Sequence, residues 1–115
     1  MNEEHTCFCK EPTTHLKLEG DVGAEPIWCG KCGANLDVDV FPISEDLKCK
    51  LMDWGFRYGE WMDWEKDRLQ KGAKQMEEAF NREGSELLEK ISREIGRSVK
   101  VEYVPSTMVR HYEQK

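Results

Sequence analysis

Apolar and polar residues alternate with a period of two in three short stretches, which is the pattern of half-buried strands. The first stretch is residues 14–18, and the turn-forming sequence of residues 19–23 follows it, so we expect a hairpin there. The second is residues 36–41, which Pro42 closes, and the third is residues 98–105. An isolated strand is not stable, so we expect the third stretch to pair with the second.

Between these strands the apolar period changes to that of a helix. Ser44 is a suitable N-cap, and apolar residues then follow at intervals of four, three, four and three, forming one stripe: Leu47, Leu51, Trp54, Tyr58 and Trp61. We expect this helix to extend from residue 44 to about residue 69. Gly55 and Gly59 each weaken it by roughly 1 kcal/mol relative to alanine.

A second helix is expected over residues 71–95. Its inner face carries Met76, Phe80, Leu87, Leu88, Ile91 and Ile95. Gly96 is a natural helix stop, and Gly84-Ser85 predicts either a kink or a break with a fresh cap at Ser85. Residues 106–115 mix apolar and charged positions and predict no element.

Two close cysteine pairs flank the first predicted hairpin. Cys7-Phe8-Cys9 and Cys29-Gly30-Lys31-Cys32 are separated by nineteen residues. Four thiolates in two pairs suit one tetrahedral Zn²⁺, and Gly33 can take the positive φ that closes such a turn. We therefore predict a structural zinc site with the ligands Cys7, Cys9, Cys29 and Cys32.

The second cysteine pair, with Gly33 after it, resembles the knuckle of zinc-ribbon and rubredoxin-like proteins. The resemblance covers the N-terminal third of the chain and implies a zinc-bound β-ribbon. Those families repeat Cys-x2-Cys, whereas the first pair here has one intervening residue, so His5 or His15 could replace one of its cysteines.

The thiols also allow other chemistry. Cys29 and Cys32 have the spacing of a redox dithiol, but no helix that would lower the first thiol's pKa is predicted after Cys32. Cys49 is the fifth cysteine and lies on the flank of the first predicted helix. It is either an unreactive surface residue or a reactive sensor thiol.

The predicted fold is α+β. An N-terminal zinc-bound β-ribbon over residues 1–35 is followed by a body over residues 36–115. The body consists of a strand, two antiparallel helices and a C-terminal strand. The helices are expected to cover one side of the short sheet.

Charge narrows the classes of partner. The chain of 115 residues has a formal net charge of −6, and its first 43 residues carry eight acidic and three basic residues. Such a surface repels phosphate backbones and favours a basic protein partner. The acidic N-terminus lacks an apolar signal-peptide core, and no run approaches membrane-spanning length, so we expect a cytoplasmic protein with reduced thiols.

The outer side of the first predicted helix combines aromatic rings with carboxylates. The residues in this sector are Asp53, Phe56, Glu60, Asp63, Trp64 and Asp67. Aromatic anchors supply binding energy and acidic groups steer a basic partner, so this set is the predicted partner-binding surface. The alternative is that the zinc module or the C-terminal tail packs over the two rings.

No catalytic constellation is visible: no Ser, His and carboxylate arrangement and no glycine-rich phosphate loop. We therefore expect a non-enzymatic protein-binding module. In size, charge and architecture it resembles small acidic bacterial immunity or antitoxin-type proteins, which implies an inhibitor that neutralises a basic partner. The alternatives are a nucleic-acid-associated zinc ribbon and a Cys-x-x-Cys redox protein. The sequence does not determine the oligomeric state.

Overall fold

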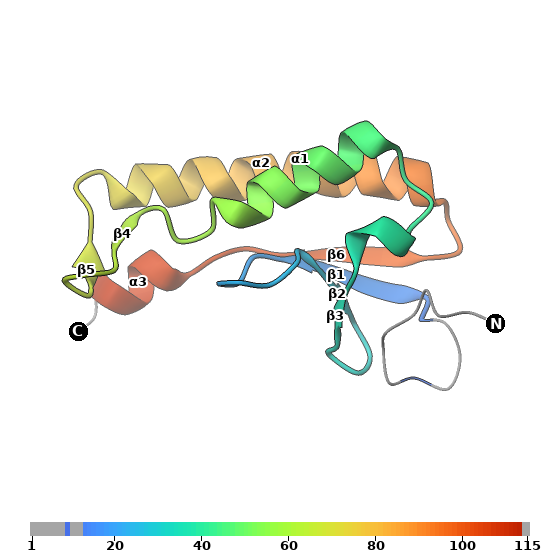
Figure 1. The fold of residues 1–115 in the computed structure, drawn as a ribbon, viewed down its shortest axis with the longest axis horizontal. Helices are drawn as coiled ribbons and strands as arrows, with labels where there is room; N and C mark the ends of the chain where they lie inside the picture. The colour runs from blue at the N-terminus through green and yellow to red at the C-terminus, as the bar shows by residue number, and fades with distance from the viewer. Residues whose placement is uncertain (1–8, 10–12, 114–115) are drawn as a thin grey trace.

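The computed structural model describes Cys9 and residues 13–113. Two helices, α1 (Glu45–Phe56) and α2 (Ala73–Ile95), lie along one face of a four-stranded sheet (Figure 1). A short third helix, α3 (Met108–Glu113), follows the last strand of that sheet. The predicted α+β class and the helical cover on one side are confirmed. Within the described residues, no helix is both long and apolar enough to cross a bilayer.

The sheet joins the two ends of the chain. Its strands run in the order β3-β2-β1-β6, with bounds β1 (His15–Glu19), β2 (Ile27–Cys29), β3 (Asn35–Leu36) and β6 (Lys100–Val104). The pairs β1–β2 and β2–β3 are antiparallel, which confirms the predicted hairpin, whereas β6 lies parallel to β1.

The expected pairing of the last strand with residues 36–41 is wrong. The strand there ends at Leu36, and residues 38–40 form a short 3-10 helix, η1 (Val38–Val40). The Asp37 carboxylate accepts a hydrogen bond from the Asp39 N–H at 2.9 Å, which stabilises the helical turn. With residues 38–40 folded away, β6 pairs with β1 instead.

The first helix begins where the sequence predicts and ends thirteen residues earlier than expected. The Leu47 N–H donates to the Ser44 hydroxyl at 3.2 Å, which confirms the cap. After Phe56, Gly59 has φ +85°, outside the helical region. A small hairpin follows, formed by β4 (Met62–Asp63) and β5 (Arg68–Leu69). The prediction of helix over residues 57–69 is therefore wrong.

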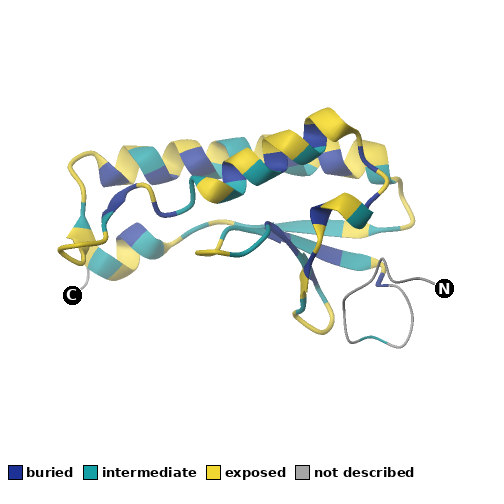
Figure 2. Cartoon of the chain, in the orientation of Figure 1, coloured by how far each residue is buried: buried dark blue, intermediate teal, exposed yellow. Residues whose placement is uncertain are grey.

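The core is centred on three aromatic rings. Trp54 stacks on Phe80 with ring centroids 4.3 Å apart, and its indole N–H donates to the Phe80 carbonyl at 2.9 Å. Trp61 meets Phe80 edge-on at 5.2 Å. Leu16 and Leu18 of β1 are fully buried in the same core cluster. Figure 2 shows the buried and exposed sides of the two long helices.

The second helix is continuous through Gly84, so the expected break with a fresh cap at Ser85 is wrong. The residue is small for a packing reason: a Cβ at Gly84 would lie 2.6 Å from the Tyr103 ring of β6. The Tyr103 hydroxyl donates to the Asn81 amide oxygen at 2.7 Å, which fixes that ring in place. Gly96, with φ +95°, ends the helix as predicted.

The tail is anchored by a buried carboxylate. Glu77 of α2 accepts hydrogen bonds from the Ser106 hydroxyl at 2.7 Å and from the Val109 N–H at 3.1 Å. Val109 is itself buried. Residues 106–113, for which the sequence predicts no element, are thus held against α2 by an acidic side chain.

Two glycine-to-alanine changes should act in opposite directions. Alanine favours a helix by up to about 1 kcal/mol, but in Gly84→Ala the clash with Tyr103 should dominate and lower the free energy of unfolding by about 1–3 kcal/mol. In Gly55→Ala the new Cβ would meet Pro26 at 3.6 Å, an ordinary contact, so this variant should be as stable as the parent or more so. Urea unfolding followed by tryptophan fluorescence measures both. Stabilisation by Gly84→Ala would contradict the packing argument.

Candidate metal site and partner-binding surface

Three cysteine sulfurs converge beside the first hairpin. The Sγ atoms of Cys9, Cys29 and Cys32 all lie within 4.8 Å of one another. The Cys9 and Cys29 sulfurs are 3.7 Å apart, and no disulfide joins the three residues. With Zn–S bonds of about 2.3 Å, two sulfurs on a tetrahedron would be about 3.8 Å apart. The observed spacing fits that edge.

The backbone of the second cysteine pair is arranged around the Cys29 sulfur. The N–H groups of Lys31 and Cys32 point at it, with N···S distances of 3.4 and 3.5 Å. The Gly33 N–H closes the turn onto the Cys29 carbonyl at 3.0 Å, with φ +81° at Gly33. Burial raises the pKa of the Cys29 thiol, but hydrogen bonds from Thr13, Cys32 and Lys31 outweigh it and lower the pKa to about 6. The arrangement favours a thiolate.

The remaining candidate ligands are placed differently. Cys7 and His5 lie outside the described residues. His15 does not join the thiol cluster: its Nε2 atom pairs with the Glu102 carboxylate, and its ring lies against Gly30. Cys49 is exposed on α1 and is also separate from the cluster. Of the four predicted ligands, the structure brings three together.

The predicted partner-binding residues are divided between two elements. Asp53 and Phe56 lie on α1, whereas the other four lie in the segment that contains the small hairpin. Several of them also make contacts within the chain. Asp53 pairs with Arg57 at 3.3 Å, and Asp67 accepts a hydrogen bond from the Tyr112 hydroxyl at 2.8 Å.

The two predicted aromatic anchors are exposed. Phe56 is 81% exposed and Trp64 is 54% exposed. Among the described residues, neither those of the predicted zinc module nor those of the C-terminal tail cover these two rings. Trp64 nevertheless packs over Gly59, and its indole N–H donates to the Gly59 carbonyl at 3.2 Å. Phe56 is the more available ring.

Sequence reasoning missed one residue of this surface. Val22, at the tip of the loop between β1 and β2, is 62% exposed. It lines a hollow of about 230 Å³ together with residues of the same loop and of the end of α1, among them Met52, Phe56 and Tyr58. The only sequence signal was a bulky apolar residue within turn-forming residues 19–23, which fixes no spatial neighbour.

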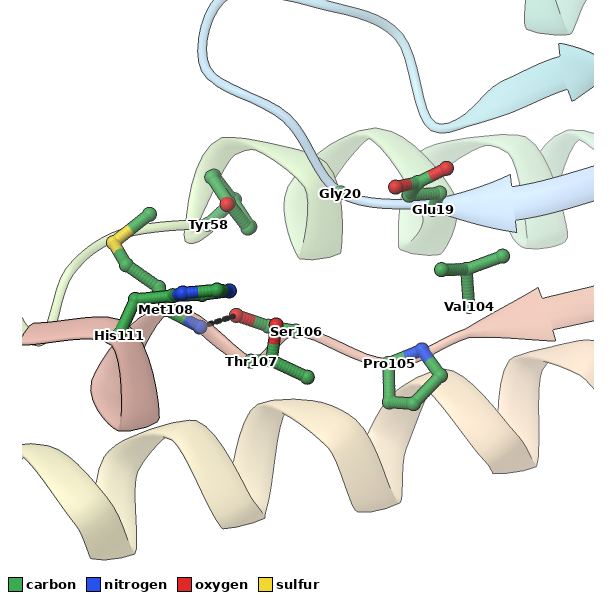
Figure 3. A pocket seen from close by; sticks show the side chains of 9 residues that line it. All are labelled: Glu19, Gly20, Tyr58, Val104, Pro105, Ser106, Thr107, Met108 and His111. Atoms are coloured by element: carbon green, nitrogen blue, oxygen red, sulfur yellow. Dashed lines mark hydrogen bonds between the residues drawn. The ribbon is translucent and has the colours of Figure 1, made fainter. Parts of the chain in front are cut away.

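A larger hollow of about 480 Å³ opens where the parallel strands β1 and β6 end (Figure 3). Glu19 lines it from the end of β1 and Gly20 from the residue after it, and residues 104–108 line it from β6 and the segment after it. Tyr58 borders both hollows. Burial, followed by the negative charges of Asp21, Glu77 and Glu19, raises the pKa of Tyr58.

A protein-family model described as Serratia CdiI immunity protein-like matches residues 14–106. This is well over half of the chain, from the start of β1 to the residues just after β6. The chain belongs to this family. A comparison with curated proteins finds no match.

The extent of the match bears on both candidate sites of this CdiI-like chain. The matched segment contains Cys29, Cys32, Val22 and Phe56, but it begins after Cys9. Membership confirms the resemblance to bacterial immunity-type proteins that size, charge and architecture indicate. The match carries no information on a metal, so the zinc-ribbon resemblance stays a prediction.

Proposed function

We propose that this chain is an immunity protein that binds a protein toxin and blocks its activity without catalysing a reaction. The observation that carries the proposal is the family match over residues 14–106. Neutralisation by direct binding requires a stable scaffold with an accessible surface. Large exposed apolar side chains on a buried aromatic core meet that requirement.

The proposed partner is basic. The chain carries a net charge of −6, and complementary charge raises the association rate and rejects partners of the wrong sign. The same charge disfavours nucleic acid as the ligand. The proposed compartment is the cytoplasm, where the three clustered thiols stay reduced.

We further propose that the thiol cluster holds a structural Zn²⁺. Cys9, Cys29 and Cys32 would supply three ligands, and Cys7 is the proposed fourth. The 3.7 Å sulfur separation and the two N–H groups directed at Cys29 support this assignment. When bound, the ion would tie Cys9 to the hairpin that carries β1 and β2, and structural zinc contributes on the order of 10 kcal/mol to small folds.

The redox alternative uses the same atoms. Cys29 and Cys32 have the spacing of a reactive dithiol, and the lowered pKa of Cys29 suits a nucleophilic thiolate as well as a metal ligand. Cys9, however, lies as close to Cys29 as a third metal ligand would, and a dithiol does not need it. The three-sulfur arrangement favours zinc.

The immunity proposal predicts rescue of growth. A toxin domain encoded alongside the gene of this chain is induced in a sensitive bacterium, with and without the chain. Co-expression should restore growth, and the purified proteins should form a stoichiometric complex in size-exclusion chromatography. Rescue should weaken when an inducible promoter lowers the expression of the chain below that of the toxin, because a stoichiometric inhibitor neutralises one toxin molecule per inhibitor molecule. Failure of every such toxin to bind the chain would contradict the proposal.

The zinc proposal predicts one equivalent of metal in protein purified under reducing conditions, measured by elemental analysis. Cys32→Ser and Cys9→Ser should each lose most of the zinc and lower the Tm. Each substitution removes one ligand, and the remaining thiolates cannot complete a tetrahedral site. Cys49→Ser, an exposed thiol on α1, is the matched control and should keep both zinc and Tm.

A metal-free, reduced and fully folded parent protein would contradict zinc binding. In that case, reversible disulfide formation between Cys29 and Cys32, followed by mass spectrometry after alkylation, would support the redox alternative.

A further inference from the structure

We propose that the hollow between residues 21–25 and the end of α1 receives a lysine or arginine side chain from a basic segment of the toxin. This inference rests on the proposed function and names the contact that carries it. The anchors on this chain are Val22 and Phe56, and the charge is supplied by Asp21 and Glu25.

The apolar part of the argument comes from exposure. Val22, Phe56 and Trp64 are the large apolar side chains left exposed among the described residues, and the first two border the same hollow. Val22 comes from the loop between β1 and β2 and Phe56 from the last turn of α1, so the fold brings them together from distant parts of the chain. Exposed apolar side chains that meet in one hollow offer a partner apolar surface to bury.

The charged part comes from the rest of the lining. Asp21 and Glu25 are the charged residues that line the hollow, and no lysine or arginine of the described residues joins them. Each carboxylate is positioned by a backbone N–H: Val22 donates to Asp21 at 2.7 Å, and Val38 donates to Glu25 at 2.8 Å. One oxygen of each carboxylate is therefore oriented by a backbone N–H close to the apolar anchors.

A lysine or arginine side chain fits this combination. Its alkyl stem would lie on Val22 and Phe56 while its cationic head meets the carboxylates. Phe56 and Tyr58 also line the hollow, and aromatic rings attract a nearby cation. A volume of about 230 Å³ is below the usual 300–1,000 Å³ of a small-molecule pocket, so one inserted side chain suits it better than a free ligand.

A second copy of this chain is a poorer occupant. A symmetric contact through this hollow would place the carboxylates of Asp21 and Glu25 against the same carboxylates of the other copy. Such like-charge contact costs free energy on both sides of the interface. The acidic lining therefore favours a basic partner of a different sequence.

The test uses the purified full-length chain and the toxin domain that the parent chain neutralises. Calorimetry gives Kd for Phe56→Ala and Asp21→Lys at low and moderate salt. Phe56→Ala should weaken binding about tenfold or more at both salt concentrations, because it removes an apolar anchor. Asp21→Lys should weaken binding most at low salt, where charge attraction is least screened.

The matched control sits outside the hollow. Glu89→Lys makes the same kind of charge reversal on α2 and should leave Kd within about threefold of the parent value. Trp64→Ala removes the exposed ring of the predicted surface that lies outside the hollow, and it should weaken binding less than Phe56→Ala. Thermal unfolding of each variant confirms that the fold is retained.

Tight binding by the parent chain with unchanged Kd for Phe56→Ala and Asp21→Lys would overturn this inference and leave the immunity proposal standing. Loss of binding with Trp64→Ala alone would also overturn it and would move the contact to the β4–β5 hairpin. If Phe56→Ala instead converted a dimer of the chain into monomers in sedimentation, the hollow would be a self-contact and the inference would be wrong. Absence of any binding by the parent chain would overturn both proposals.

Discussion

The parallel pairing of β6 with β1 holds the rest of the structure in place. Five residue pairs join a strand near the start of the chain to one near its end. A parallel pair needs a long crossover, and here α1, the small hairpin and α2 supply it on one face of the sheet. The larger hollow opens just beyond the carboxyl ends of the two strands. The pairing thereby brings α2 and the core residues of β1 together.

The core beneath that crossover depends on aromatic packing more than on helix propensity. Phe80 contacts both buried tryptophans, and Trp54 also donates a hydrogen bond to the backbone of α2. Trp61 keeps its buried position although it lies beyond the end of α1. Tyr103 continues the packing across the sheet, where Gly84 leaves room for its ring. These contacts give the exposed surface a rigid support.

The two candidate sites lie at opposite ends of β1. Cys29 pairs with Leu16 near the beginning of that strand, and Val22 follows its end. A metal at the thiol cluster would therefore support the hairpin without touching a partner at the Val22 and Phe56 hollow.

The sequence by itself determined the local features. Both helix starts, the stop at Gly96, the first hairpin and the closeness of Cys29 to Cys32 depend on neighbours in the chain, and local pattern and spacing record these. Trp61 is buried as the apolar stripe of the first predicted helix indicates, but it lies beyond the end of α1, and its ring is held in the core by tertiary contacts with Phe80 and Tyr58. Tertiary structure decided the rest. Strand partners, the role of Gly84 and the meeting of Val22 with Phe56 depend on contacts between distant segments, which no local pattern encodes.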